Sequence, residues 1–233
     1  MRRCCEILTE LEEDVKKLNE KIEAFKLEMG CGEPVEPPEP VEPPLNETKI
    51  GIVVGHNSGD QGADNIYGES EFEFHSRTMP IVREKLLERG YDAEVFYRPS
   101  GVSYDDQCEQ IANDMDAANI KIAYCIHFNS YDGSTNGIEN LVMNNCTVKS
   151  TTMAKQLADE LHSVYGYNLR GEDGAKTISR SDNGAGMLIS IQNKGIDCTL
   201  VEHCFGDAPT SRRTFDDENV FTAAVANGMI RGT

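Results

Sequence analysis

The chain has 233 residues, 39% of them hydrophobic, and a formal net charge of −18 at pH 7 from 40 acidic and 22 basic side chains. The length fits one ordinary domain with additional material. The excess of negative charge argues against nucleic acid and anionic membrane surfaces as direct partners, because both bind through basic patches. No apolar run is long enough to span a bilayer, so no membrane insertion is expected.

The first predicted element is an N-terminal helix within residues 1–30. Its apolar positions alternate in steps of three and four, at Leu8, Leu11, Val15, Leu18, Ile22, Phe25 and Met29. This spacing is a heptad seam and predicts a short coiled coil, with a homodimer through residues 8–29. Lys21 and Lys26 would face each other in a parallel dimer, so an amphipathic helix docked on the rest of the chain stays an alternative.

An acidic proline-rich linker is predicted over residues 31–45. Gly30-Cys31-Gly32 stops the helix, and the segment EPVEPPEPVEPP follows. Proline fixes polyproline II geometry and glutamate keeps the segment solvated, so it acts as a semi-rigid spacer. The remaining residues, 46–233, form the predicted catalytic domain.

From residue 46 onward, short apolar runs alternate with longer amphipathic segments. Helices are predicted at 70–89, 105–118, 150–165 and 209–229, and strands at 50–54, 93–97, 122–126, 138–143, 187–191 and 198–201. Such alternation predicts an α/β fold with a mostly parallel twisted sheet flanked by helices.

Three apolar runs end in side chains that carry chemistry. The runs KIGIVVGH, KIAYCIH and DCTLVE deliver His56, His127 and Glu202. Open α/β sheets place their sites at the carboxyl ends of strands, so these side chains are expected at one rim. A carboxylate in an apolar strand is costly to bury, so Glu202 is either half of an ion pair or a catalytic group. His56 and His127 are candidate ligands of a zinc ion. Hydrolytic zinc sites use three protein ligands and keep one position open, so a third ligand is expected from Glu69, Glu71 or Glu73.

The order GH…E…IHFN…VExxF resembles the zinc-dependent N-acetylmuramoyl-L-alanine amidases of the Amidase_3 type, and most of all phage endolysin catalytic domains. The resemblance covers roughly residues 49–233 and implies a phosphorylase/hydrolase-like sheet and peptidoglycan as substrate. It implies Zn²⁺ bound by His56, Glu71 and His127, with Glu202 as general base and acid. One departure is Asn57-Ser58, where the family usually has a second glycine after the histidine.

The resemblance also bears on residues near these motifs. Asn129 matches the second position of a His-x-Asn motif, and Arg170 resembles the arginine that precedes the family's groove loop. Both are expected to contact substrate or to support the metal ligands. His203 should point to the opposite face of its strand from Glu202, and Cys204 should pack. His75 and His162 are interpreted as solvent-facing helix residues.

Two other functions stay open at this point: a zinc peptidase acting within the stem peptide, and a non-catalytic phage or prophage structural protein that binds the wall. A serine hydrolase and a nucleotide-binding loop are disfavoured, because the chain has no GxSxG motif and GDQGA lacks a lysine. The eight cysteines show no CxxC spacing. Glutamates interrupt the apolar stretch that a signal peptide would need near the N-terminus. We therefore expect a reduced protein, made in the cytoplasm, that acts on the cell wall after release during lysis or as part of a virion.

Overall fold

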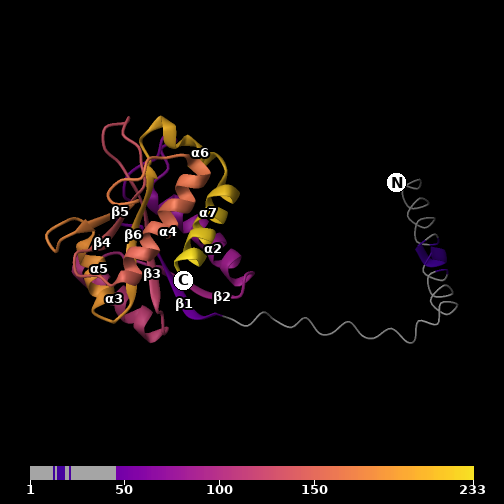
Figure 1. Ribbon diagram of the computed structural model, residues 1–233, viewed down its shortest axis with the longest axis horizontal. Helices are drawn as coiled ribbons and strands as arrows, with labels where there is room; N and C mark the ends of the chain where they lie inside the picture. Colours follow the sequence, from indigo (N-terminus) through magenta and orange to yellow (C-terminus); the bar gives the residue numbers. More distant parts are fainter. Residues whose placement is uncertain (1–12, 14, 19–20, 22–45) are drawn as a thin grey trace. The chain divides into compact units, whose positions relative to one another are not determined.

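The computed structural model describes residues 13, 15–18, 21 and 46–233 (Figure 1). The chain divides into two units, Met1–Glu42 and Pro43–Thr233, which are described separately. All described residues of the first unit are helical, and Val15 and Leu18 are exposed. The rest of the predicted heptad seam and the predicted linker 31–45 lie outside the described residues.

The second unit is built on one six-stranded sheet. In spatial order its strands are β2 (Tyr91–Tyr97), β1 (Asn46–Val54), β3 (Ile122–Asn129), β6 (Asp197–Phe205), β4 (Glu139–Met143) and β5 (Ala175–Ile178). Neighbouring strands are parallel except β4 and β6, which pair antiparallel. The predicted mostly parallel α/β sheet is confirmed.

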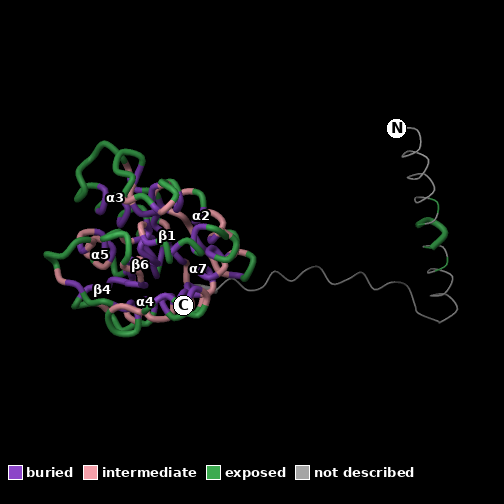
Figure 2. Tube along the Cα trace, turned by 90° about the horizontal axis from the view of Figure 1, so that it is seen from above, coloured by how far each residue is buried: buried purple, intermediate pink, exposed green. Residues whose placement is uncertain are grey.

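Helices cover both faces of the sheet (Figure 1). The cluster that contains Ile50, Ile52 and Val54 packs against α2 (Glu71–Leu87), α4 (Val148–Tyr165) and α7 (Glu218–Gly232). Val53 and Cys125 point the other way, toward α3 (Tyr104–Ala117) and α5 (Ala185–Gln192). Successive strand residues alternate between these two cores, and Figure 2 shows the buried positions along the strands and the inward sides of the helices.

One helix and one short strand of the structure differ from the prediction. The apolar run 187–191 is not a strand but the middle of α5, whose buried residues Met187, Leu188 and Ile191 follow helical spacing. A short apolar run has no period that separates strand from buried helix, which explains the error. The four-residue strand β5 was not predicted, since its pattern AKTI is short and half polar.

The predicted last helix, 209–229, is divided into three. Pro209–Ser211 form a 3-10 helix (η1), α6 covers Arg212–Asp216, and Asp217 breaks the chain with extended backbone (φ −138°). The Asp217 carboxylate then accepts hydrogen bonds from the backbone N–H groups of Asn219 and Val220. Asp217 therefore caps α7, which is the interruption that hydrophobic spacing alone does not show.

Two further expectations from the sequence concern membrane-spanning helices and the cysteines. Within the described part of the chain, no helix combines the length and apolarity that crossing a membrane requires. The described cysteines, including buried Cys125 and Cys198, are all free, in agreement with the predicted packing role of these thiols.

Candidate active site

His56 lies directly beyond the carboxyl end of β1, where the backbone makes an abrupt turn. Its φ is +63°, a left-handed conformation that is uncommon for a residue other than glycine. The preceding Gly55 leaves no space for a side chain, because a Cβ atom there would lie 2.4 Å from the Ile126 carbonyl oxygen and 2.7 Å from His127 Nδ1. The close approach of β1 and β3 at this point brings the two imidazoles together, with ring centroids 5.0 Å apart.

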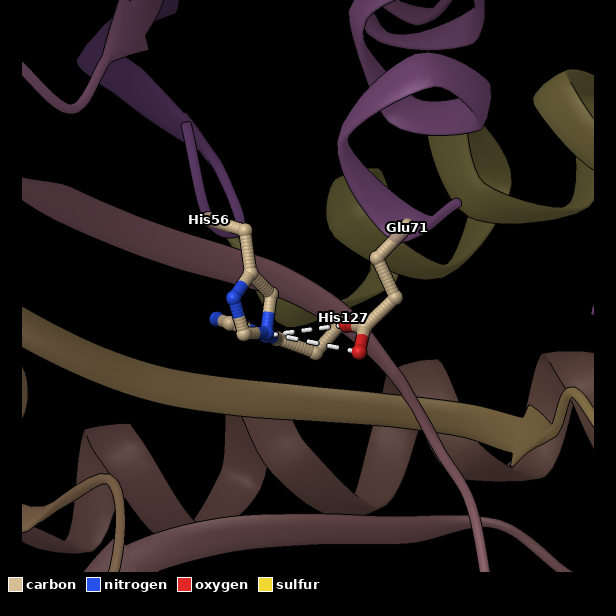
Figure 3. Close-up of side chains that lie close together, drawn as sticks. All are labelled: His56, Glu71 and His127. Atoms are coloured by element: carbon tan, nitrogen blue, oxygen red, sulfur yellow. Dashed lines mark hydrogen bonds and ion pairs between the residues drawn. The ribbon is translucent and has the colours of Figure 1, made fainter. Parts of the chain in front are cut away.

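Glu71 is the first residue of α2, and its buried carboxylate lies between the two histidines (Figure 3). Its Oε1 is 3.3 Å from His56 Nε2 and its Oε2 is 3.1 Å from His127 Nδ1. The backbone N–H groups of Ala63 and Phe128 donate to the same carboxylate at 3.1 and 3.2 Å. Burial alone would raise the pKa of Glu71, but the hydrogen bonds with His127 and His56 outweigh it and hold that pKa well below its usual range.

The ionisation of the two histidines differs. Burial lowers the pKa of His127 in spite of the Glu71 carboxylate, which keeps this imidazole in the neutral form that binds metals. Burial also opposes the charged form of His56, but the hydrogen bond and the charge of Glu71 prevail and raise its pKa. His56 Nδ1 lies 3.4 Å from the Asp60 carboxylate, within ion-pair distance, but has no hydrogen-bond partner among the described residues.

The three side chains fit a metal ion of the zinc type. One ligand atom from each of His56, Glu71 and His127 lies within 4.8 Å of the others. Two imidazole nitrogens and one carboxylate oxygen are the donor set of several hydrolytic zinc sites. Gly62 keeps the cluster compact, since a Cβ atom there would lie 2.6 Å from His56 Cδ2 and 2.8 Å from Glu71 Oε1.

The two competing glutamates have other partners. Glu73 forms a capping box with Ser70, whose side chain accepts from the Glu73 N–H while the Glu73 carboxylate accepts from the Ser70 N–H. Glu69 pairs with Arg77. Of the three candidates that the sequence left open, the structure brings Glu71 together with the histidines.

Glu202 lies on β6 opposite His127, its register partner on β3. Its side chain is half-buried, and its Oε2 atom is buried without a hydrogen-bond partner among the described residues. Burial, followed by the charges of Glu71 and Glu139, raises the pKa of Glu202 well above its usual value. No described cation forms an ion pair with it, so this carboxyl group is suited to exchange a proton.

Glu139, the first residue of β4, is the other register neighbour of Glu202. Arg170 Nε and Lys176 Nζ each donate to the Glu139 carboxylate at 2.6 Å, and the Arg170 guanidinium lies 5.1 Å from the centre of the Phe205 ring. Arg170, predicted near the substrate, thus lies beside the site through Glu139. Sequence analysis missed Glu139 and Lys176, although a glutamate at the start of an apolar strand was a usable signal.

A cleft of about 710 Å³ opens over the face of the sheet that α3 and α5 cover. His56, His127, Asn129 and Glu202 line it, together with Arg98, Glu139 and Lys176. Asn129, predicted near the ligands, lies at the end of β3 and bonds through its side chain to the next backbone N–H, that of Ser130, at 3.0 Å. The predicted residues of three separate motifs therefore meet at one cleft.

One histidine prediction was wrong. His75 is not solvent-facing: it is fully buried on the inner side of α2, which also carries Glu71, Thr78, Met79 and Val82 at helical spacing. This helical spacing is the sequence signal from which the burial of His75 could have been predicted. His203 does point away from Glu202, as predicted, and packs against His75, while Cys204 is buried and His162 is exposed.

Comparison with known proteins bears on the fold and on the family. No curated protein sequence matches the chain. The catalytic domain of the CD27L endolysin, which targets Clostridia difficile, has a similar structure with a TM-score of 0.64 and 19% identity, over 78% of this chain and 97% of that domain. The Mycobacterium smegmatis amidase Ami1 is similar with a TM-score of 0.65 and 16% identity, over 81% of this chain and 97% of Ami1.

The TM-scores show that this chain shares its fold with both proteins. The model of the N-acetylmuramoyl-L-alanine amidase family, Amidase_3, matches residues 50–232, which contain the whole sheet core and every side chain of the cleft described above. The chain therefore belongs to the N-acetylmuramoyl-L-alanine amidases, the hydrolases that cleave the bond between N-acetylmuramic acid and L-alanine in peptidoglycan.

Proposed function

We propose that this amidase binds Zn²⁺ through His56, Glu71 and His127 and uses Glu202 as its general base and acid. One observation carries the proposal: an ionised carboxylate lies between two imidazoles, and a second carboxyl group with a raised pKa stands in register beside them. The family is generally zinc-dependent, and the donor set here is of the type that zinc uses.

The chemistry follows from the positions of these residues. A zinc ion, when bound, supplies Lewis acidity that lowers the pKa of a water molecule and polarises the scissile carbonyl. Glu202 accepts a proton from the attacking water and delivers one to the leaving nitrogen of L-alanine. The carbon–nitrogen bond breaks, a carbon–oxygen bond forms, and the products are a muramic acid carboxylate and a stem peptide with a free amino terminus.

The environment of Glu202 suits both halves of this cycle. Its raised pKa makes it a better proton acceptor than an ordinary carboxylate, and the neighbouring Glu71 and Glu139 charges favour the protonated state that follows. Asn129 lines the cleft, and Arg170 lines a second pocket that shares Asn129, Glu139 and Lys176 with it. Both residues are proposed to contact substrate or hold the ligands in place.

The remaining parts of the chain have proposed roles too. Residues 46–233 would form the amidase domain, 31–45 a spacer and 1–30 a helix that pairs with a second copy through residues 8–29. Val15 and Leu18, two apolar positions of the predicted seam, are exposed, which supports pairing. We infer that the protein is made in the cytoplasm and acts on the wall after release during lysis or as part of a virion, a role that the similar endolysin domain supports.

The test is a digestion of purified peptidoglycan with the zinc-loaded protein and mass analysis of the products. The expected products are intact stem peptides with a new amino-terminal alanine. New amino termini within the stem would instead identify a peptidase. Binding to the wall without any cleavage would identify a structural protein and refute the catalytic assignment.

A further inference from the structure

Arg98 is a buried cation without a counter-ion on the wall of the cleft. It directly follows β2, is 8% exposed, and lines the same cleft as His56, His127 and Glu202. No carboxylate in the described part of the chain forms an ion pair with it, although Asp60 and Asp182 line the same cleft. A buried guanidinium with no anion is costly, so this arrangement calls for an explanation.

The guanidinium is held rigidly on one side. Nε and Nη2 donate to the Gln107 side-chain oxygen at 3.1 and 2.8 Å, and the Tyr104 ring lies 5.1 Å from the guanidinium carbon. Gly186 allows this ring its position, because a Cβ atom there would lie 2.8 Å from Tyr104 Cε1. Nη1 has no hydrogen-bond partner in the described chain, so one corner of the fork is left for a ligand.

The same network fixes Arg98 relative to the metal ligands. The Gln107 side-chain oxygen also accepts from Asn57 Nδ2 at 3.0 Å, and Gln107 Nε2 donates to the Val102 carbonyl at 3.1 Å. Asn57 follows His56 and accepts the backbone N–H groups of Gly59 and Asp60 through its side chain. The asparagine that replaces a glycine expected from the family resemblance thereby ties the His56 loop to Gln107 and Arg98.

The other permanent cation of the cleft, Lys176, already has a carboxylate partner. Lys176 is exposed and pairs with Glu139 at 2.6 Å, as does Arg170 beside the cleft. Arg98 alone combines burial, fixed orientation and an unpaired charge among the described residues of the cleft. A planar guanidinium with free donors suits a carboxylate better than any neutral group, and it does so most strongly where water is excluded.

We propose that Arg98 binds a carboxylate of the stem peptide and so makes the amidase prefer stems with a free acid near the scissile bond. The carboxyl group of N-acetylmuramic acid is consumed in the amide that is cleaved, so the free carboxylates of the substrate lie on the peptide side. The inference rests on the amidase function and adds a determinant of which stems are accepted.

The test compares two muropeptides that differ only at the α-carboxyl group of the second stem residue, D-glutamate, which is free in one and a carboxamide in the other. Zinc-loaded full-length protein is expected to cleave the free acid with a kcat/KM about 10-fold or more above that of the amide, mainly through KM, which corresponds to about 1.4 kcal/mol or more. Arg98→Gln is expected to lower kcat/KM for the acid by about 10- to 100-fold, to leave the amide nearly unchanged and so to remove the preference.

Two control variants locate the effect. Arg212→Gln removes an exposed arginine outside the cleft and is expected to change neither rate. Lys176→Gln removes the exposed cleft cation that pairs with Glu139 and is expected to keep the acid-to-amide ratio. Zinc content and thermal unfolding of each variant show that the site is assembled, and Arg98→Lys, which keeps the charge without the planar fork, is expected to retain only part of the preference.

Several outcomes would overturn the proposal. Equal cleavage of both muropeptides by the unaltered protein would overturn it. This result needs no variant, so the proposal stays testable even if Arg98→Gln does not fold. Loss of the preference in Lys176→Gln but not in Arg98→Gln would assign it to Lys176. An equal fall in kcat on both substrates in Arg98→Gln would assign Arg98 to the transition state. Cleavage of neither substrate by the unaltered protein would contradict the amidase function itself.

Discussion

His75 and His203 lie with their Nε2 atoms 3.0 Å apart, deep between α2 and β6. Glu71 is one helical turn before His75, and Glu202 immediately precedes His203, so the pair joins the two elements that carry the proposed ligand and the proposed base. Burial lowers the pKa of both imidazoles, that of His203 to about 3, so both are neutral and a single hydrogen joins them. The Nδ1 atom of each has no hydrogen-bond partner among the described residues.

We expect the contributions of His75 and His203 to the free energy of unfolding to be strongly coupled. Either His75→Leu or His203→Leu leaves the other Nε2 buried without a partner, which costs about 1–3 kcal/mol. The double variant removes both polar groups and should be less destabilised than the sum of the single variants. Urea unfolding of the four proteins measures the cycle, and additive effects would show that the 3.0 Å contact contributes nothing.

The same pair should make the fold sensitive to acid. Both pKa values are lower in the folded protein than the ordinary value of about 6.5, so the unfolded chain binds more protons below that pH. Stability from the neutral pair is therefore complete above about pH 6.5 and declines as the pH falls toward the folded-state pKa values. The double leucine variant should lose less stability than the unaltered protein between pH 7.5 and 5. Parallel curves would contradict the assignment.

Removal of one proposed ligand should separate metal binding from folding. His127→Ala is expected to reduce zinc from about one ion per chain to almost none and to abolish cleavage, while the sheet core, which does not include this rim residue, stays folded. Metal analysis after dialysis and circular dichroism measure the two properties. Exposed His162→Ala is the matched control and should retain full zinc. Full zinc occupancy in His127→Ala would refute the ligand set.

Glu202→Gln should leave the metal in place and stop the chemistry. Glutamine keeps the size of the side chain but cannot accept the proton, so the rate is expected to fall by about 10²- to 10⁴-fold. Zinc content should stay near one per chain, because the three ligand atoms are on other residues. If the variant lost its zinc, Glu202 would be a ligand; if it kept its rate, another group would be the base.

The N-terminal helix is expected to determine the oligomeric state. A chain that starts at Asn46 should be monomeric and keep its activity on soluble muropeptides, since every proposed site residue lies downstream. In the full-length chain, Leu18→Asp with Ile22→Asp should mimic the truncation, because a charge buried in a seam costs several kcal/mol unless it is paired. Analytical ultracentrifugation at tens of micromolar protein measures the oligomeric state of each form. A monomeric full-length protein would refute the dimer hypothesis.

The sequence alone determined the frame and much of the candidate site. The strands β1 and β3 were predictable because an apolar run that ends abruptly in Gly-His or His-x-Asn is a local signal, and parallel strands bring their carboxyl ends to one rim. The positions of His56, His127 and Glu202 at one cleft follow from that rule. The side chains of Glu202 and His203 were predicted to lie on opposite faces of their strand from its two-residue period, which tertiary contacts do not alter.

Other features depended on contacts between segments far apart in the chain. The family resemblance favoured Glu71 over Glu69 and Glu73, and the packing of α2 against β1 and β3 brings Glu71, rather than the other two, beside His56 and His127. The antiparallel pairing of β4 with β6 sets Glu139 beside Glu202, and no local period encodes that neighbour. The burial of Arg98 against Gln107 and of His75 against His203 likewise arises where separate elements meet, so the tertiary structure alone decided which polar side chains have partners within the described chain.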